Sequence, residues 1–440
     1  MTISTKQHNA IALLIFLALL VFFRLNSAAF HEAESIIVFK ADLLVQFNGW
    51  LDLAPYSSPN GSFTLPPMSI WLTALVMKYI GNLPLHLRLV SALFSAGSLV
   101  LLYQIARRIV GYQLALIAPA LLAATVMWNE MARQVTPEIP AVTFMLLGLW
   151  SVIMLHERED IPGKIGFAAL YALGIAGACL SNFVAGGMTL LIALPFVFHP
   201  RRSVIWLVGG IVFGLAAPIS WYSHVFFTFS ALASPYSVGT FIQSMGSLLM
   251  SQPFVILAVS TPFLIFRLSR STSNSPRSRV PETAMMVLLL TGLLCSGFSS
   301  FSTILLLAPA AILLALRAFE LLSSPQSARI AWILLLGLIL TTVASMNVVA
   351  YGFIRNVVTG VENLVDTLLL AVVLAVLLGL GFILPKVRLY MLTSRLLRWS
   401  GVVIPVLLIL RILVTNISKA PNAIQQEAAH SPTELIESIG

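Results

Sequence analysis

Acidic side chains gather in a polar segment near the start of the chain, directly after an apolar run of membrane-span length. Glu32 and Glu34 follow that run, and a third acid, Glu138, lies between two prolines before a later apolar run. At a water–membrane boundary, partial burial tunes the pKa of a carboxylate, which can then take a proton from a hydroxyl or bind a divalent ion. These acids predict chemistry at a membrane surface and favour an enzyme over a channel.

Two arginines, Arg88 and Arg133, are predicted near the ends of helices on the same side of the membrane. A guanidinium can hold a phosphate through two parallel hydrogen bonds. We therefore expect Arg88 and Arg133 to bind a phosphate-bearing substrate, with His31 and Glu34 as further substrate contacts. A divalent ion held by carboxylates could also neutralise a departing phosphate, and Glu32 is a candidate ligand for it.

The remainder of the chain is strongly apolar. Of its 440 residues 59% are hydrophobic and only 9% are charged, which exceeds what a soluble core can bury. Apolar runs of about 20 residues, the length that crosses a bilayer, recur along it. We therefore expect an all-α polytopic membrane protein of about 13 transmembrane helices. The predicted helices begin near Ala10, Leu85, Leu114, Ile139, Ile165, Val184, Ser203, Ser247, Thr283, Ser302, Ile330, Thr367 and Val402.

The charged residues orient these helices. Most of the 25 Lys and Arg residues fall in alternate loops, and most of the 16 acids fall in the others. Because cytoplasmic loops carry the excess of Lys and Arg, this pattern predicts a multi-pass protein of the cell (inner or plasma) membrane with a cytoplasmic N-terminus and an external C-terminus. The net charge of +9 follows from this topology, so we expect no nucleic-acid partner.

The chain divides into a membrane domain and a short tail. Residues 1–415 are predicted to form the transmembrane domain, and residues 416–440 an external, poorly ordered end. The long external loop, residues 27–84, contains two short apolar stretches that we expect to lie as helices at the membrane interface. One is 68–80, and the other repeats apolar residues at helical spacing: Ile36, Phe39, Leu43 and Phe47.

The order of these features resembles the GT-C glycosyltransferases, in particular the ArnT, protein O-mannosyltransferase and RgtA-like group of the glycosyltransferase family 39 type. Order and spacing agree over about residues 10–225. The segments that carry the resemblance are, in chain order, His31-Glu32, Leu65–Leu72, Arg88–Leu93, Tyr103–Gly111 and Ala132–Pro140.

This resemblance implies an inverting GT-C enzyme that transfers a hexose or pentose from a polyprenyl-phosphate donor on the external, periplasmic side. The acceptor would be a glycan, a lipid or a protein, and membrane lipids would surround the chain. Glu32 and Glu138 would be the catalytic carboxylates and, with a divalent metal ion, its ligands.

The chain departs from the family pattern at several positions. The family's first-loop Asp is His31 here, and its second Asp is Glu138. Family lysines are replaced by Leu65 and Asn182, and the stretch 302–309 lacks the Lys and Tyr of a later turn. These departures keep a second hypothesis open, namely a transporter or flippase of lipid-linked glycans, or an inactive GT-C scaffold that binds such lipids.

The placement of charge bears on that alternative. Transporters tend to carry ionisable residues within their helices and to show internal repeats. The predicted helices here are almost free of charge, with Arg411 as the main exception, and the sequence shows no repeated half. The sequence therefore favours the enzyme.

Overall fold

The structure of the chain is a computed structural model. The residues it describes are 5–22, 25, 30, 32–47, 50, 66–197, 204–228, 281, 284–285, 287–288 and 300–322. All regular secondary structure in this part of the chain is helical. The helices are α1 (Thr5–Phe22), α2 (Glu32–Phe47), α3 (Pro67–Tyr79), α4 (Pro84–Ile109), α5 (Gly111–Ala115), α6 (Ile117–Ala124), α7 (Val126–Met131), α8 (Glu138–Glu157), α9 (Ile161–Ser181), α10 (Phe183–Leu191), α11 (Leu194–Val197), α12 (Val204–Thr228) and α16 (Ser300–Leu322).

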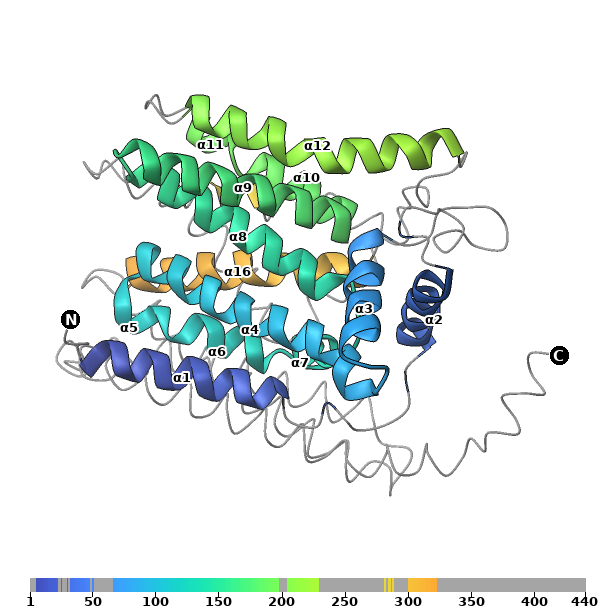
Figure 1. Cartoon of the computed structure of the whole chain (residues 1–440). Coiled ribbons are helices and arrows are strands. Elements are labelled where there is room, and N and C mark those ends of the chain that lie inside the picture. The colour runs from blue at the N-terminus through green and yellow to red at the C-terminus, as the bar shows by residue number, and fades with distance from the viewer. Residues whose placement is uncertain are drawn as a thin grey trace, which may run out of the picture.

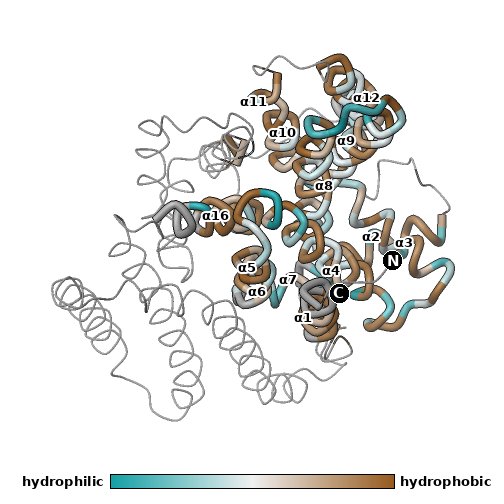
Figure 2. The backbone as a smooth tube through the Cα atoms, turned by 90° about the vertical axis from the view of Figure 1, so that its left-hand side faces the viewer, coloured by the Kyte–Doolittle hydropathy of each residue, from teal (hydrophilic) through white to brown (hydrophobic). Residues whose placement is uncertain are grey.

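Within these residues four helices are long and apolar enough to cross a membrane, namely α4, α8, α9 and the 204–224 part of α12. Figure 1 shows them side by side, with their axes roughly parallel. Figure 2 looks along the bundle, and the helices are coloured mostly brown and white, as expected for segments surrounded by lipid and by one another. The prediction of an all-α, multi-pass membrane protein is confirmed for the described residues.

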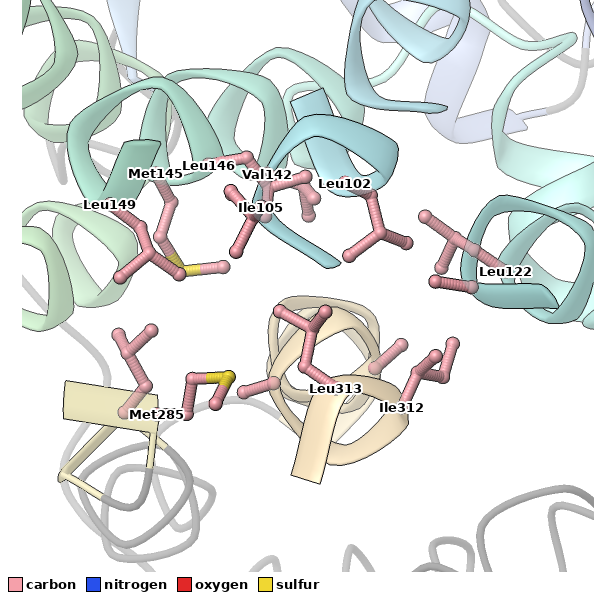
Figure 3. Close-up of a cluster of buried hydrophobic side chains, with 14 of the residues drawn as sticks. Leu102, Ile105, Leu122, Val142, Met145, Leu146, Leu149, Met285, Ile312 and Leu313 are labelled. Atoms are coloured by element: carbon pink, nitrogen blue, oxygen red, sulfur yellow. The ribbon is translucent and has the colours of Figure 1, made fainter. Parts of the chain in front are cut away.

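The core of the bundle lies around α8, which packs against α4, α9 and α16. Figure 3 shows apolar side chains of α4 and α8 on one side of this core and those of α16 on the other. Leu102, Leu149 and Leu313 are each at most 1% exposed. With α8 held on several sides, the segment that leads into it has a fixed position at the end of the bundle.

Helices α8 and α9 approach each other through glycine. A Cβ atom added to Gly174 of α9 would lie 2.9 Å from the Gly148 backbone of α8, closer than real Cβ contacts come. Small residues that let two backbones approach are a common means of helix association within membranes, where apolar surface alone drives little association.

Two predicted spans are interrupted. The span expected from Leu114 consists of the short helices α5, α6 and α7, with breaks at Leu116 and Thr125, where Thr125 has an extended backbone. The span expected from Val184 is likewise divided into α10 and α11. Apolar composition predicted membrane depth at both places, but it does not report a change of backbone direction.

Helices α2 and α3 lie at one end of the bundle, and Figure 1 shows both running across the direction of α4, α8 and α9. They pack together through Ile37 and Leu44 of α2 and Ile70 of α3, all buried. The ridge that the sequence singled out faces outward, with Phe39 63% and Phe47 74% exposed. Helix α2 therefore has two apolar faces, of which one packs against α3 and the other is exposed. We call this region the α2–α3 end.

Some predictions concern residues outside the described part. These are the predicted spans from Ser247, Ile330, Thr367 and Val402, the tail 416–440, and the side chains of His31 and Leu65.

Candidate active site

A buried ion pair lies at the α2–α3 end. The Arg88 Nε donates to Glu34 Oε1 at 2.8 Å and Arg88 Nη2 donates to Glu34 Oε2 at 2.9 Å, while Nη1 donates to the carbonyl of Leu25 at 3.1 Å. The side chains are only 4% and 1% exposed, and the Phe30 ring lies 5.3 Å from the guanidinium carbon. A charged pair is tolerated at such burial only when its geometry and its further hydrogen bonds are good, as they are here.

The same carboxylate also holds the segment between α7 and α8. The backbone N–H of Val135 donates to Glu34 Oε1 at 3.0 Å. Glu34 thus joins three separate parts of the chain, namely the start of α2, the start of α4 and the 132–137 segment. That segment contains Arg133 and leads into Glu138, so the ion pair helps to hold the backbone that carries both of them.

Helix α7 is anchored one layer deeper in the bundle. The Trp128 indole, which is fully buried, donates from Nε1 to Ser95 Oγ of α4 at 3.0 Å. Below it, Ser98 Oγ of α4 lies 2.8 Å from Thr143 Oγ1 of α8. Arg88, Ser95 and Ser98 form one polar face of α4, so this helix fixes α7, the following segment and α8 together.

The two candidate carboxylates lie beside this ion pair in the chain. Glu138 is the first residue of α8, is half-buried, and faces the partial positive charge of a helix N-terminus. Glu32 is the first residue of α2 and precedes Glu34 by less than one helical turn. Arg133 is half-buried and donates from Nε to the carbonyl of Asn129 at 2.9 Å. The Glu34–Val135 contact therefore brings the two backbone segments that carry Glu32 and Glu138 together.

Asn182, which the sequence analysis singled out, caps a helix, and Lys40 of α2 is half-buried. Asn182 replaces a family lysine, and its Oδ1 accepts from the N–H groups of Val184 and Ala185 at the start of α10, at 2.9 and 3.2 Å. It is a helix cap, for which Asn is among the preferred residues. On α2, burial lowers the pKa of Lys40 from its ordinary value.

Aromatic side chains form part of the same end. Trp71 of α3 and Trp221 of α12 meet edge to face with ring centroids 5.1 Å apart, and the Trp71 indole donates to the carbonyl of Trp50 at 3.1 Å. Trp221 is only 6% exposed. These two tryptophans connect α3 to α12 within the protein.

A further point is whether the acidic side chains at this end could bind a metal ion. Among the described side chains no three of His, Cys, Asp and Glu lie close enough to share an ion. Of the two candidate metal ligands, Glu138 supplies one carboxylate at this end, and the side chain of Glu32 is not among the described residues. One or two carboxylates together with a substrate phosphate are enough for Mg²⁺, which keeps several waters, so the residues present suit an ion bound jointly with substrate.

The sequence named Glu34 and Arg88 separately but missed their pairing and the contact with Val135. A partial signal was available, because an arginine in a membrane helix commonly pairs with an acid or with backbone carbonyls, but it does not say which acid. It missed Trp128 and Ser95 entirely, since neither differs from an ordinary apolar or small residue of a membrane helix.

The fold and the placement of these residues can now be compared with those of known proteins. Residues 64–222 match the family described as dolichyl-phosphate-mannose-protein mannosyltransferase. That range holds α3, α4, α8, α9 and most of α12, and so most of the site. The resemblance predicted from the sequence is confirmed.

Solved structures show the same fold. The crystal structure of ArnT from Cupriavidus metallidurans in the apo state has a TM-score of 0.64 and 17% identity, covering 94% of this chain and 77% of that one. The same protein bound to undecaprenyl phosphate gives 0.63 and 18%, covering 95% and 78%. The arabinosyltransferase EmbB from Mycobacterium smegmatis gives 0.58 and 17%, covering 97% and 41%.

Two curated relatives come from Aquifex aeolicus (strain VF5), both uncharacterised proteins. One is 30% identical over 163 residues, which are 34% of this chain and 33% of the relative. The other is 25% identical over 222 residues, 48% of this chain and 50% of the relative. The chain thus spans between a third and a half of the length of the curated relatives it matches.

Proposed function

We propose that this protein is a glycosyltransferase that moves a sugar from a polyprenyl-phosphate donor to an acceptor on the external side of the membrane. The observation that carries the proposal is the Glu34–Arg88–Val135 contact, which brings the segments of Glu32 and Glu138 together at one end of the bundle. The family match of residues 64–222 to a mannosyltransferase and the ArnT-like fold support it, as does an ArnT structure with undecaprenyl phosphate bound.

In this proposal the acceptor hydroxyl attacks the anomeric carbon of the donor from the side opposite the phosphate. The new C–O bond forms while the bond to the phosphate oxygen breaks, and the configuration inverts. A carboxylate, Glu32 or Glu138, takes the hydroxyl proton, and the polyprenyl phosphate leaves as an anion. Partial burial at the α2–α3 end serves this step, because electrostatic stabilisation is stronger where water is excluded.

The leaving phosphate needs positive charge. Of the two predicted cations, Arg88 already donates two hydrogen bonds from its guanidinium to the Glu34 carboxylate. We therefore assign Arg133, which is half-buried on the segment before Glu138, to the phosphate, and we assign Glu34 and Arg88 to positioning. A divalent ion bound to Glu32, Glu138 and the phosphate would supply further neutralisation. We also propose that the chain crosses the membrane about 13 times, with its N-terminus in the cytoplasm and its C-terminus outside.

The test is made with the purified full-length protein in proteoliposomes. The donors are radiolabelled undecaprenyl-phosphate hexoses and pentoses, offered with a membrane extract as the acceptor source. Transfer of label to a water-soluble, protein or second lipid product supports the enzyme. Movement of labelled lipid between leaflets without any transfer would instead establish the transporter or flippase, and binding with neither would establish an inactive scaffold.

A further inference from the structure

Three buried hydroxyl groups at the α2–α3 end have no hydrogen-bond partner. They belong to Ser69 of α3, Thr136 before α8 and Ser181 at the end of α9, whose exposed fractions are 3%, 9% and 0%. A buried polar group without a partner costs about 1–3 kcal/mol, and folded proteins leave few such groups. An unpartnered hydroxyl in a membrane-protein core therefore calls for an explanation.

These groups lie on elements that meet at one end of the bundle. Their chain neighbours Ile70, Val135 and Leu180 belong to a single buried cluster, and α3 packs directly against α9. Figure 1 shows α3 beside one end of α8 and of α9. In the described part of the chain, the unpartnered buried hydroxyls all lie on these elements.

Buried hydroxyls elsewhere in the bundle are satisfied. Ser95 Oγ accepts from Trp128, Ser98 pairs with Thr143, and Thr189 Oγ1 donates to the carbonyl of Ala185 at 2.7 Å. The fold can thus satisfy a hydroxyl when the group is structural. The three unpartnered groups lie instead at the end of the bundle that carries Glu138, next to the Trp71–Trp221 pair of the same cluster.

We propose that this α3–α9 junction binds the sugar of the lipid-linked donor, a conclusion that rests on the proposed function. A sugar ring offers hydroxyls that both donate and accept, which suits Ser69, Thr136 and Ser181, and it offers C–H faces that suit aromatic rings such as Trp71. Since the three oxygens are closed to solvent, the sugar reaches them when α3 separates from α9. Hydrogen bonds made only in the liganded state then drive this opening.

The proposal predicts an unusual pair of effects for Ser69→Ala with Ser181→Ala. Without ligand the double variant is at least as thermostable as the wild type, because two unpartnered groups are gone. The double variant binds the sugar-bearing lipid at least about tenfold more weakly than the wild type, because each lost hydroxyl removes about one hydrogen bond to the sugar. Its affinity for undecaprenyl phosphate without sugar is unchanged. Ser95→Ala is the matched control, since it removes a hydroxyl that has a partner and lowers the melting temperature.

The experiment measures melting temperatures of the full-length protein in nanodiscs, alone, with undecaprenyl phosphate, and with undecaprenyl-phosphate mannose, glucose or arabinose. Binding to the native state raises the melting temperature in proportion to affinity. The expected result is an added stabilisation by one sugar-bearing lipid in the wild type that is lost in the double variant. If the wild type shows no such addition, or the variant keeps it, the sugar site is refuted while lipid binding stands.

Two further outcomes are decisive. If Ser181→Ala lowers the melting temperature as Ser95→Ala does, the Ser181 hydroxyl is already satisfied and the inference is wrong. If no lipid stabilises the wild type at all, the proposed function fails, and the sugar site fails with it.

Discussion

Replacing Arg88 by alanine should destabilise the protein more than any change to a surface ion pair. Glu34 is 1% exposed and loses a two-point ionic partner, leaving a buried carboxylate with only the Val135 N–H and its remaining contacts. Removing one member of a buried pair costs about 3–5 kcal/mol, mostly from the uncompensated charge left behind. The control is Arg158→Ala: this arginine pairs with Asp160 at 3.7 Å with both side chains 51% exposed, and such pairs contribute about 0–1 kcal/mol.

The free energy of unfolding is measured by SDS titration in mixed micelles, following tryptophan fluorescence. The double variant Arg88→Met with Glu34→Leu should regain most of the lost stability, because both charges leave together. Sugar transfer should stay low in that variant, since the Val135 N–H has lost its acceptor and the segment with Arg133 is released. A loss for Arg88→Ala no larger than for Arg158→Ala would refute the burial argument. A double variant as unstable as Arg88→Ala would show that shape, and not charge, matters there.

Three further changes test the packing around the site. Gly174→Ala should force α8 and α9 apart and lower thermal stability, because the new Cβ would meet the Gly148 backbone. The control is Gly166→Ala, which should leave thermal stability unchanged because a Cβ there would have nothing within 4 Å. Thermal unfolding in detergent compares the two variants. Asn182→Ala should cost about 1 kcal/mol by removing the α10 cap, and Asn182→Asp should restore it, measured by SDS titration. Trp128→Phe should cost about 1 kcal/mol through the lost indole hydrogen bond and lower the transfer rate with it; equal rates at reduced stability would exclude a positioning role.

Much of the fold could be predicted from the sequence because apolar run length reports membrane depth directly. Spans expected from Leu85, Ile139 and Ser203 correspond to helices that begin at Pro84, Glu138 and Val204. The two helices of the polar loop, α2 and α3, were also predictable as helices from their short apolar runs, and their place at the membrane interface stays a prediction. The break at Thr125 was not, because an extended residue between two apolar helices leaves no mark on hydropathy.

The site was predictable in its residue types but not in its connections. Carboxylates in a loop beside membrane helices are conspicuous, so Glu34 and Glu138 could be named. Arg88 and Glu34 lie 54 positions apart, and spacing along the chain carries no information about which acid an arginine binds at that distance. The expected phosphate role of Arg88 followed from its charge alone; its burial, which points to positioning, is a property of the folded packing.

The central claim is that Glu32 and Glu138 carry the transfer reaction. The most direct measurement compares sugar transfer from the radiolabelled donor panel by the wild type, Glu32→Gln and Glu138→Gln, with Glu157→Gln as control, because that acid pairs with Arg108 near the other end of α8. General-base catalysis contributes about 10²–10⁴-fold. The account predicts losses of that order for both site variants, with donor binding retained and the control unaffected. Wild-type transfer that survives in both variants would contradict it.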